Sequence, residues 1–294
     1  MMRSRERLAI AVRRPDGGIE LKREPVHPIF RSHWARMPFV RGLLMLWDSL
    51  GVGISALTYS ANVAAGEEIL ASGPAMWATV ILSLVIGLGI FFALPALVAY
   101  ALERFIHTSW ESNFLEGLVR LGLFLLYLVL IGKVPDIQRV FAYHGAEHKA
   151  INAYEAGEPL TVERIRHYST QHPRCGTGFL LIVVIVSVFV FGFLGRPPIL
   201  LRLASRLLFL PLIAAISYEL MRLAAAHPAN WLARGLLKPA LALQGLTTRP
   251  PSDDMLEVSL AALSAILPEV IEGDEAERQS SRTDGSPDAQ IASS

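Results

Sequence analysis

The hydrophobic positions of this chain gather into runs that are long enough to cross a lipid bilayer. We predict four membrane-spanning helices, at residues 76–100, 114–132, 178–194 and 199–221. Each run approaches the roughly 20 apolar residues that are needed to cross about 30 Å of hydrocarbon. Pro95 predicts a kink in the first run. The short turn Gly195–Pro198 joins the last two runs into a helical hairpin.

Segments of mixed polarity precede these runs. Residues 6–24 alternate apolar and polar side chains around the turn Pro15–Gly18, which predicts a small β-hairpin. Residues 38–63 carry an apolar stripe that Arg41 and Asp48 interrupt. This pattern indicates an amphipathic helix on the membrane surface, and a tilted or re-entrant span is the alternative.

Amphipathic segments also follow the last run. Residues 228–246 predict an interfacial helix, and Asp253 and Asp254 can begin a short helix with leucines on one face. From about residue 272 the composition is typical of a disordered tail. The fold class is therefore an all-α polytopic membrane protein with a small N-terminal hairpin. We divide it into a hairpin region (1–37), an amphipathic or re-entrant segment (38–75), a four-span membrane domain (76–222) that includes a cytosolic loop (133–177), C-terminal amphipathic helices (223–270) and a disordered tail (271–294).

The composition supports a membrane protein and excludes several other classes. Charged residues make up 18% of the 294 residues, against about 25% in soluble proteins. The net charge of +1 argues against a nucleic-acid partner held by bulk charge. Cys175 is the single cysteine, which excludes an intrachain disulfide and a four-cysteine zinc site. The Arg-rich N-terminus has no signal-peptide pattern, so we expect the internal runs to direct insertion.

Basic residues are distributed unevenly among the connecting segments. Residues 1–44 contain ten Lys or Arg and residues 133–177 contain six. The loop between the first two spans contains only Arg104, and the last turn contains only Arg196. The positive-inside rule then predicts a multi-pass inner-membrane protein with both termini and the 133–177 loop in the cytoplasm. The bilayer is its expected partner and other membrane proteins are candidates, while the oligomeric state stays open.

The stretch between Pro135 and Gly157 is the most informative, because these two residues suit the first turn and the stop of a helix. Within it, His144, Glu147 and His148 form the H-x-x-E-H pattern of inverted zinc hydrolase motifs. Histidines four residues apart project from one helix face and can share a metal ion. Glu147 lies beside them, where it can act as a general base. Two surface histidines on a cytosolic helix are the alternative interpretation.

The segment before the third span supplies two more candidate ligands. His172 and Cys175 are spaced as H-x-x-C, and a thiolate binds zinc strongly. Cys175 could instead be a small buried residue at the start of a helix. His172 precedes a proline and is therefore extended, which suits either a loop ligand or an exposed histidine.

Charged residues inside the predicted spans need partners. Glu219 is a weaker candidate ligand late in the last span, and a local ion pair with Arg222 is its alternative role. Glu116 and Arg120 are four residues apart in the second span. We expect them to pair inside the bundle, because unpaired charges in lipid are costly.

Together these motifs resemble one family of membrane proteins. The residues that carry the resemblance are Met1–Ser4, Arg41–Gly42, Asn113–Gly117, Phe141–Lys149, His172–Thr177 and Ser217–Glu219. They are similar to the YqhQ-like family of bacterial membrane proteins over roughly residues 1–267. That family is of unknown function and is often labelled predicted metal-dependent enzymes, so the resemblance implies a metal at His144, Glu147 and His148. It also has a Gly-rich segment ahead of the part that matches Met1, which implies an upstream strand or a different start.

Three functions are compatible with these observations. The leading hypothesis is a membrane-embedded zinc-dependent hydrolase. In it, His144 and His148 bind the metal, Cys175 or His172 is the third ligand, and Glu147 is the general base. The second is an assembly or interaction factor in which the same cluster is structural. The third is a metal or ion transporter, which is disfavoured because no row of polar residues passes through the spans. The sequence does not identify a substrate.

Overall fold

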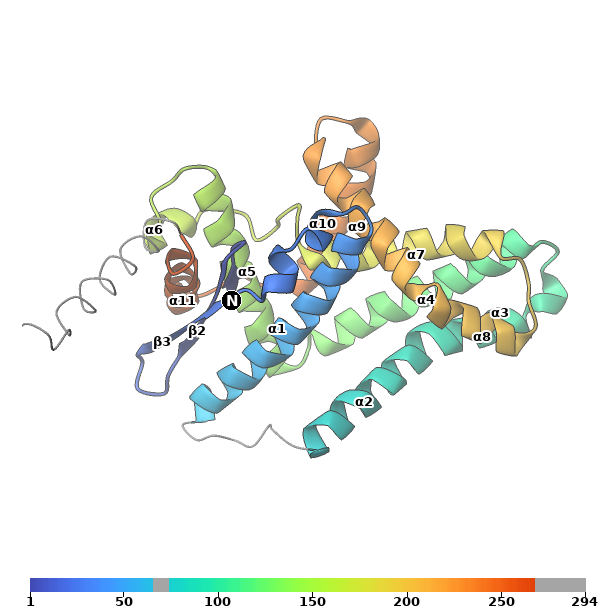
Figure 1. The fold of residues 1–294 in the computed structure, drawn as a ribbon, viewed down its shortest axis with the longest axis horizontal. Helices are drawn as coiled ribbons and strands as arrows, with labels where there is room; N and C mark the ends of the chain where they lie inside the picture. The colour runs from blue at the N-terminus through green and yellow to red at the C-terminus, as the bar shows by residue number, and fades with distance from the viewer. Residues whose placement is uncertain (66–73, 268–294) are drawn as a thin grey trace, which may run out of the picture.

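The computed structural model describes residues 1–65 and 74–267, so the predicted tail at 271–294 lies outside the described residues. Figure 1 shows an elongated molecule. A small sheet lies at one end with the helices α5 (Pro135–Glu155) and α11 (Asp253–Ser264), and a bundle of helices forms the other end. The apolar runs of the predicted membrane domain lie in the bundle. The mixed end, which combines the sheet with α5 and α11, holds the H-x-x-E-H stretch.

The sheet confirms the predicted hairpin and adds one strand. Strands β2 (Arg7–Arg13) and β3 (Ile19–Pro25) pair antiparallel, with Arg13 opposite Ile19. The short strand β1 (Met2–Arg3) pairs with the other edge of β2, giving the order β1-β2-β3. Both faces of β2 are covered. Leu8, Ile10 and Val12 pack on α1 (Val40–Ala65), while Ala9 and Ala11 belong to a core shared with α5 and α11.

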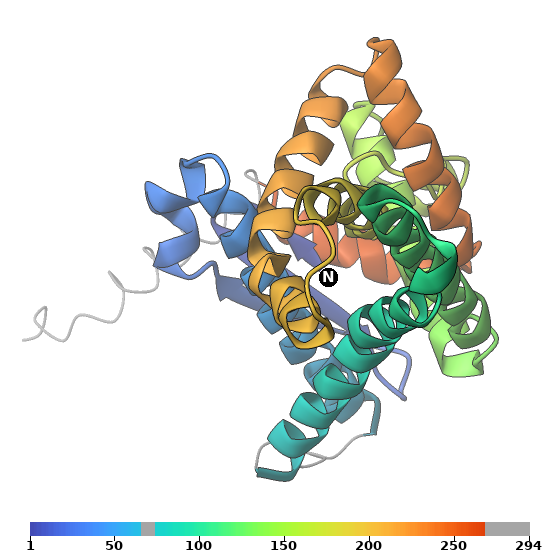
Figure 2. The ribbon, with the colours of Figure 1, turned by 90° about the vertical axis from the view of Figure 1, so that its right-hand side faces the viewer.

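Among the described residues, four helices are long and apolar enough to span a membrane, judged by length and composition, and a bent pair of helices could form a fifth span. The four are Val40–Ala64 in α1, Trp77–Ala101, Ser109–Ile131 (α4) and Gly176–Phe193 (α7). The second consists of α2 (Pro74–Leu88), a π-helical turn η3 (Gly89–Ala93) and α3 (Leu94–Ala101). The first three predicted spans therefore form, and the 38–63 segment passes the same test. Figures 1 and 2 both show α2 leaving the bundle at its N-terminal end, where apolar side chains such as Trp77 and Ile81 are exposed.

The predicted span at 199–221 is broken by a bend that the sequence did not indicate. The structure divides it into α8 (Ile199–Leu208) and α9 (Leu210–Ala226), which are bent by 45°. Pro211 lies in the first turn of α9 and cannot donate the backbone hydrogen bond that would continue α8. The bend also allows Arg202 and Arg206 to reach a buried carboxylate instead of facing lipid.

That carboxylate is Glu116, the centre of a charged cluster inside the bundle. Its oxygens accept hydrogen bonds from Arg120 at 2.7 Å, Arg206 at 2.9 Å and Arg202 at 3.1 Å. The predicted Glu116–Arg120 pair is therefore confirmed. Arg120 also donates to the carbonyl oxygen of Phe91 at 2.9 Å. This carbonyl lies four residues before Pro95 and so lacks its usual α-helical donor.

The remaining elements connect the two ends. The 3-10 turns η1 (Pro28–Arg31) and η2 (Trp34–Arg36) lead into α1, and η4 (Glu103–Phe105) leads towards α4. Helix α10 (Trp231–Thr247) confirms the predicted 228–246 helix, and Leu237 and Leu243 are among its buried residues. The short helix α6 (Val162–Ile165) lies in the segment between α5 and α7. Helix α11 begins at Asp253, as its acidic first turn predicts.

Candidate metal centre

Helix α5 presents the two histidines as the sequence predicts. Pro135 occupies its first turn, and Gly157, just beyond its end, has the left-handed φ of +74° that ends a helix. His144 and His148 lie one turn apart on the same face, with ring centroids separated by 4.3 Å. Both point towards the start of α7, so the alternative of two surface histidines does not apply: His148 is buried and His144 is only partly exposed.

Cys175 joins the two histidines from the other side. It is the N-cap of α7, and its thiol accepts a hydrogen bond from the backbone N–H of Thr177. Its Sγ lies 3.3 Å from His144 Nε2. One ligand atom from each of His144, His148 and Cys175 lies within 4.8 Å of the other two, and these three residues form the candidate metal group of the described chain.

Backbone carbonyls fix the orientation of both imidazole rings. His144 Nδ1 lies 2.9 Å from the carbonyl oxygen of Thr247, and His148 Nδ1 lies 2.6 Å from that of Thr170. A carbonyl oxygen can only accept, so each Nδ1 carries the proton. Nε2 of each ring therefore faces the shared centre, and its lone pair is available to a metal ion once the metal replaces any proton on that nitrogen. This is the arrangement that commonly orients metal-ligating histidines, and sequence motifs contain no signal for either carbonyl.

Electrostatics at the centre favour a metal-binding thiolate. Burial raises the pKa of the Cys175 thiol, but hydrogen bonds with His144 and His148 outweigh this and lower it to about 5. Burial lowers the pKa of His144, and its hydrogen bond with Cys175 reverses that effect and leaves the pKa raised. The thiolate is the form of cysteine that binds metals.

The donor set fits zinc. A sulfur and a nitrogen bound to one tetrahedral zinc at about 2.3 and 2.0 Å lie about 3.5 Å apart. The 3.3 Å between Cys175 Sγ and His144 Nε2 is close to that separation. Two imidazoles and a thiolate also belong to the ligand types that select zinc over magnesium or calcium.

His172 and Glu219 lie outside this group. The His172 ring is 5.9 Å from that of His148, and its Nε2 faces Glu155 at 3.4 Å. Gln244 holds its backbone in place through two hydrogen bonds. Glu219 pairs with Arg41 instead of with the metal group or with Arg222, the partner that proximity in sequence suggested.

Polar residues further along α5 bind the segment that leads to Cys175. Asn152 donates to the carbonyls of Ser169 at 2.9 Å and Gln171 at 3.0 Å, and Lys149 donates to that of Arg166 at 2.7 Å. The polar stripe beyond His148 therefore anchors this loop along the helix. It positions Thr170 against His148 and carries the chain to Cys175.

Gly145 allows residues 247–249 to approach α5 closely. A Cβ atom on Gly145 would lie 2.3 Å from the carbonyl oxygen of Arg249, whose N–H donates to the carbonyl of Phe141 at 3.0 Å. The missing side chain lets residues 247–249 pass close enough for Thr247 to bind His144. The glycine inside the motif is thus explained by this close approach.

We expect Gly145→Ala to destabilise the protein by about 1–3 kcal/mol, because the added methyl group must displace a hydrogen-bonded backbone. Thermal unfolding in detergent measures this effect. Gly235→Ala in α10 is the matched control, since a Cβ there meets nothing within 4 Å. Equal stability of the two variants would contradict the proposed role of the glycine.

Glu147 faces a pocket beside the metal group. Its carboxylate forms an ion pair with the amino group of Met1. The pocket has a volume of about 420 Å³ and lies between β2, α1, α5 and α11. His144 and Glu147 both line it, so the metal group borders this space through His144, while His148 and Cys175 lie behind.

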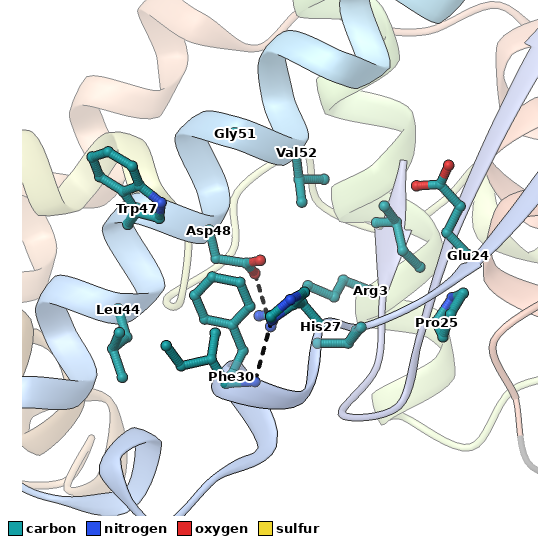
Figure 3. A pocket seen from close by; sticks show the side chains of 13 residues that line it. Arg3, Glu24, Pro25, His27, Phe30, Leu44, Trp47, Asp48, Gly51 and Val52 are labelled. Carbon is teal, nitrogen blue, oxygen red and sulfur yellow. Dashed lines mark hydrogen bonds and ion pairs between the residues drawn. The ribbon is translucent and has the colours of Figure 1, made fainter.

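A larger pocket, of about 650 Å³, lies elsewhere, between the sheet, η1 and α1 (Figure 3). Arg3 and Asp48 form an ion pair of 2.8 Å in its wall. No residue of the metal group lines it. We therefore assign the smaller pocket to the candidate site.

Comparisons with known proteins agree with the resemblance seen in the motifs. The family described as "Protein of unknown function (DUF1385)" matches residues 37–269. This chain belongs to that family. It is 31% identical over 272 residues to "Uncharacterized protein YqhQ" of Bacillus subtilis (strain 168), which covers 87% of this chain and 86% of that protein. No solved structure matches the chain.

Proposed function

We propose that this protein is a zinc-dependent hydrolase of the bacterial inner membrane. Nε2 of His144, Nε2 of His148 and Sγ of Cys175 would hold the ion. Zinc held by three protein ligands supplies a Lewis acid and lowers the pKa of water. The chain's own residues would orient the reactants and move the proton.

The shared wall of the 420 Å³ pocket is the observation that carries this proposal. A structural zinc site is closed by four protein ligands, whereas a catalytic site keeps one position open. His172, a further candidate ligand from the sequence, is turned towards Glu155 instead. His144 belongs both to the metal group and to the pocket wall, so a substrate in the pocket would lie beside the centre.

Glu147 is the proposed general base. It lies one turn from His144 on α5 and lines the same pocket. Its carboxylate now pairs with the Met1 amino group, and water would replace that group when the base acts. The side chain of Glu147 is 28% exposed, so the residues around it can hold it in place.

A structural role is the second candidate, and one observation favours it. The three ligands come from α5 and from the start of α7, two elements separated by the long 156–174 segment. A metal there would clamp the mixed end of the molecule to the bundle. In that case the protein would be an assembly or interaction factor for other membrane proteins.

The variant Glu147→Gln separates these two functions. It keeps the shape of the side chain but cannot take a proton. We expect the purified variant to keep its zinc and its melting temperature but to fail to restore the phenotype of a deletion strain. Glu158→Gln, just beyond the end of α5, is the control and should restore it. A metal-loaded, stable and fully functional Glu147→Gln protein would exclude the hydrolase.

We also propose that both termini and the metal group face the cytoplasm, because the basic residues concentrate in those segments. Single cysteines test this in a Cys175→Ala background. Asp16→Cys and Glu163→Cys, both at exposed positions, should react with an impermeant maleimide only after the membrane is opened. Pro198→Cys, in the short turn between α7 and α8, should react in intact spheroplasts. Labelling of positions 16 and 163 on opposite sides would contradict this topology.

A further inference from the structure

We propose that the 420 Å³ pocket takes one acyl chain of an anionic phospholipid and brings its ester group to His144 and Glu147. The substrate class would then be a glycerolipid ester drawn from the bilayer itself. This inference rests on the proposed hydrolase, because it names the substrate of the same site.

The pocket has the chemistry of a site for a hydrocarbon chain. Its floor comes from β2, with Ile10 and Val12, and its walls come from α1 and α5, with Leu57, Val140 and Tyr143 among them. The polar groups His144 and Glu147 lie together on the α5 wall. An apolar pocket with a few convergent polar groups is the usual form of a small-molecule site.

An exposed apolar stripe on α1 runs directly into this pocket. Leu43, Leu46 and Leu50 are exposed on the N-terminal half of the helix. Gly53 and Leu57 continue the same stripe at helical spacing, and both line the pocket. Leu57 is 62% exposed and thus lies at the rim. A lipid chain held along the outer half of α1 would therefore reach the pocket without crossing a polar surface.

The occupant that suits this pocket is an acyl chain rather than a helical peptide. An α-helix with its side chains is about 10 Å wide. A single hydrocarbon chain is far thinner and can lie lengthwise between β2, α1 and α5.

A guanidinium group at the rim suits an anionic headgroup. Arg139 lines the pocket and is exposed, and it has no ion-pair partner among the residues that the structure describes. Arg13, the other guanidinium there, is already paired with Glu257 at 2.7 Å. Arginine binds phosphate in a fork geometry, so Arg139 can hold the headgroup while the chain enters the pocket.

The reaction is an ordinary ester hydrolysis. Glu147 takes a proton from water, and the water oxygen forms a bond to the ester carbonyl carbon. The bond from that carbon to the glycerol oxygen breaks, and the glycerol oxygen receives the proton from Glu147. The products are one fatty acid and one lysophospholipid, with no oxidant or further reactant.

A photo-crosslinking experiment tests the binding step independently of activity. The full-length protein is reconstituted in vesicles that contain phosphatidylglycerol with a diazirine near the end of one acyl chain. We expect crosslinks to β2 and α5 residues of the pocket. Gly53→Leu fills the pocket and should reduce them about tenfold, because added methylenes in a fitted space are poorly tolerated. Gly51→Leu is the matched control on the same helix, and a Cβ at either glycine meets nothing within 4 Å.

The outcomes separate this inference from the proposed function. Glu147→Gln should crosslink as well as the unmodified protein and release no fatty acid. Crosslinks confined to the exposed stripe, or unchanged in Gly53→Leu, would overturn the lipid substrate. Crosslinking that is abolished by an added apolar peptide would also overturn the lipid substrate. The hydrolase proposal would survive each of these results if Glu147→Gln still fails in cells with its zinc in place.

Discussion

Replacing His148 with alanine is expected to remove the zinc from the purified protein. The unmodified protein should carry about one zinc per chain, as a site with three protein ligands does. His148 is buried, its Nδ1 is held by the Thr170 carbonyl, and no other described histidine has a ring nitrogen in position to replace it. The variant should therefore retain only a trace of metal after dialysis, measured by inductively coupled plasma mass spectrometry.

His172→Ala is the control for this experiment. His172 is equally buried and lies in the same region, but its ring faces Glu155. It should keep its zinc. Full occupancy in a His144→Ala/His148→Ala double variant would contradict the assignment, and loss of zinc in His172→Ala would show that the group has a fourth ligand.

The sequence was sufficient to predict the parts of this site that depend on local spacing. Pro135 and Gly157 determine where α5 begins and ends, and the separation of four residues between His144 and His148 places them on one face. Cys175 lies 31 residues from His144, and the H-x-x-C spacing was the only local signal for it. Cys175 lies beside the histidines because Asn152 and Lys149 bind the loop that leads to it.

Contacts between distant segments were not predictable from local patterns. Glu219 pairs with Arg41, 178 residues away, because α1 packs beside α9. The carbonyl of Thr247 reaches His144 only because Gly145 leaves room for its segment. The bend between α8 and α9 was missed for a similar reason. Apolar composition alone suggested one span, while the charged partners of Arg202 and Arg206 lie about 90 residues earlier in the chain.

Loss of the carboxylate of Glu116, which binds these arginines, is expected to have the largest effect on stability in the bundle. Glu116→Gln should lower the free energy of unfolding by about 3–5 kcal/mol, because removing one side of a buried ion pair leaves the other side uncompensated. Glu116 is 1% exposed and bridges Arg120, Arg202 and Arg206, so its loss leaves three guanidinium groups with Glu103 as their remaining anionic partner among the described residues.

Thermal unfolding in detergent, followed by circular dichroism, measures this change. The exposed Glu6→Gln is the control and should unfold as the unmodified protein does. The cluster lies near the start of α4, whereas the metal group lies at the start of α7, and α4 and α7 run in opposite directions along the bundle (Figure 1). Glu116→Gln should therefore retain its zinc below its lowered melting temperature. A melting temperature equal to that of Glu6→Gln would mean that the arginines find other partners, and the cluster would then not hold α8 in the bundle.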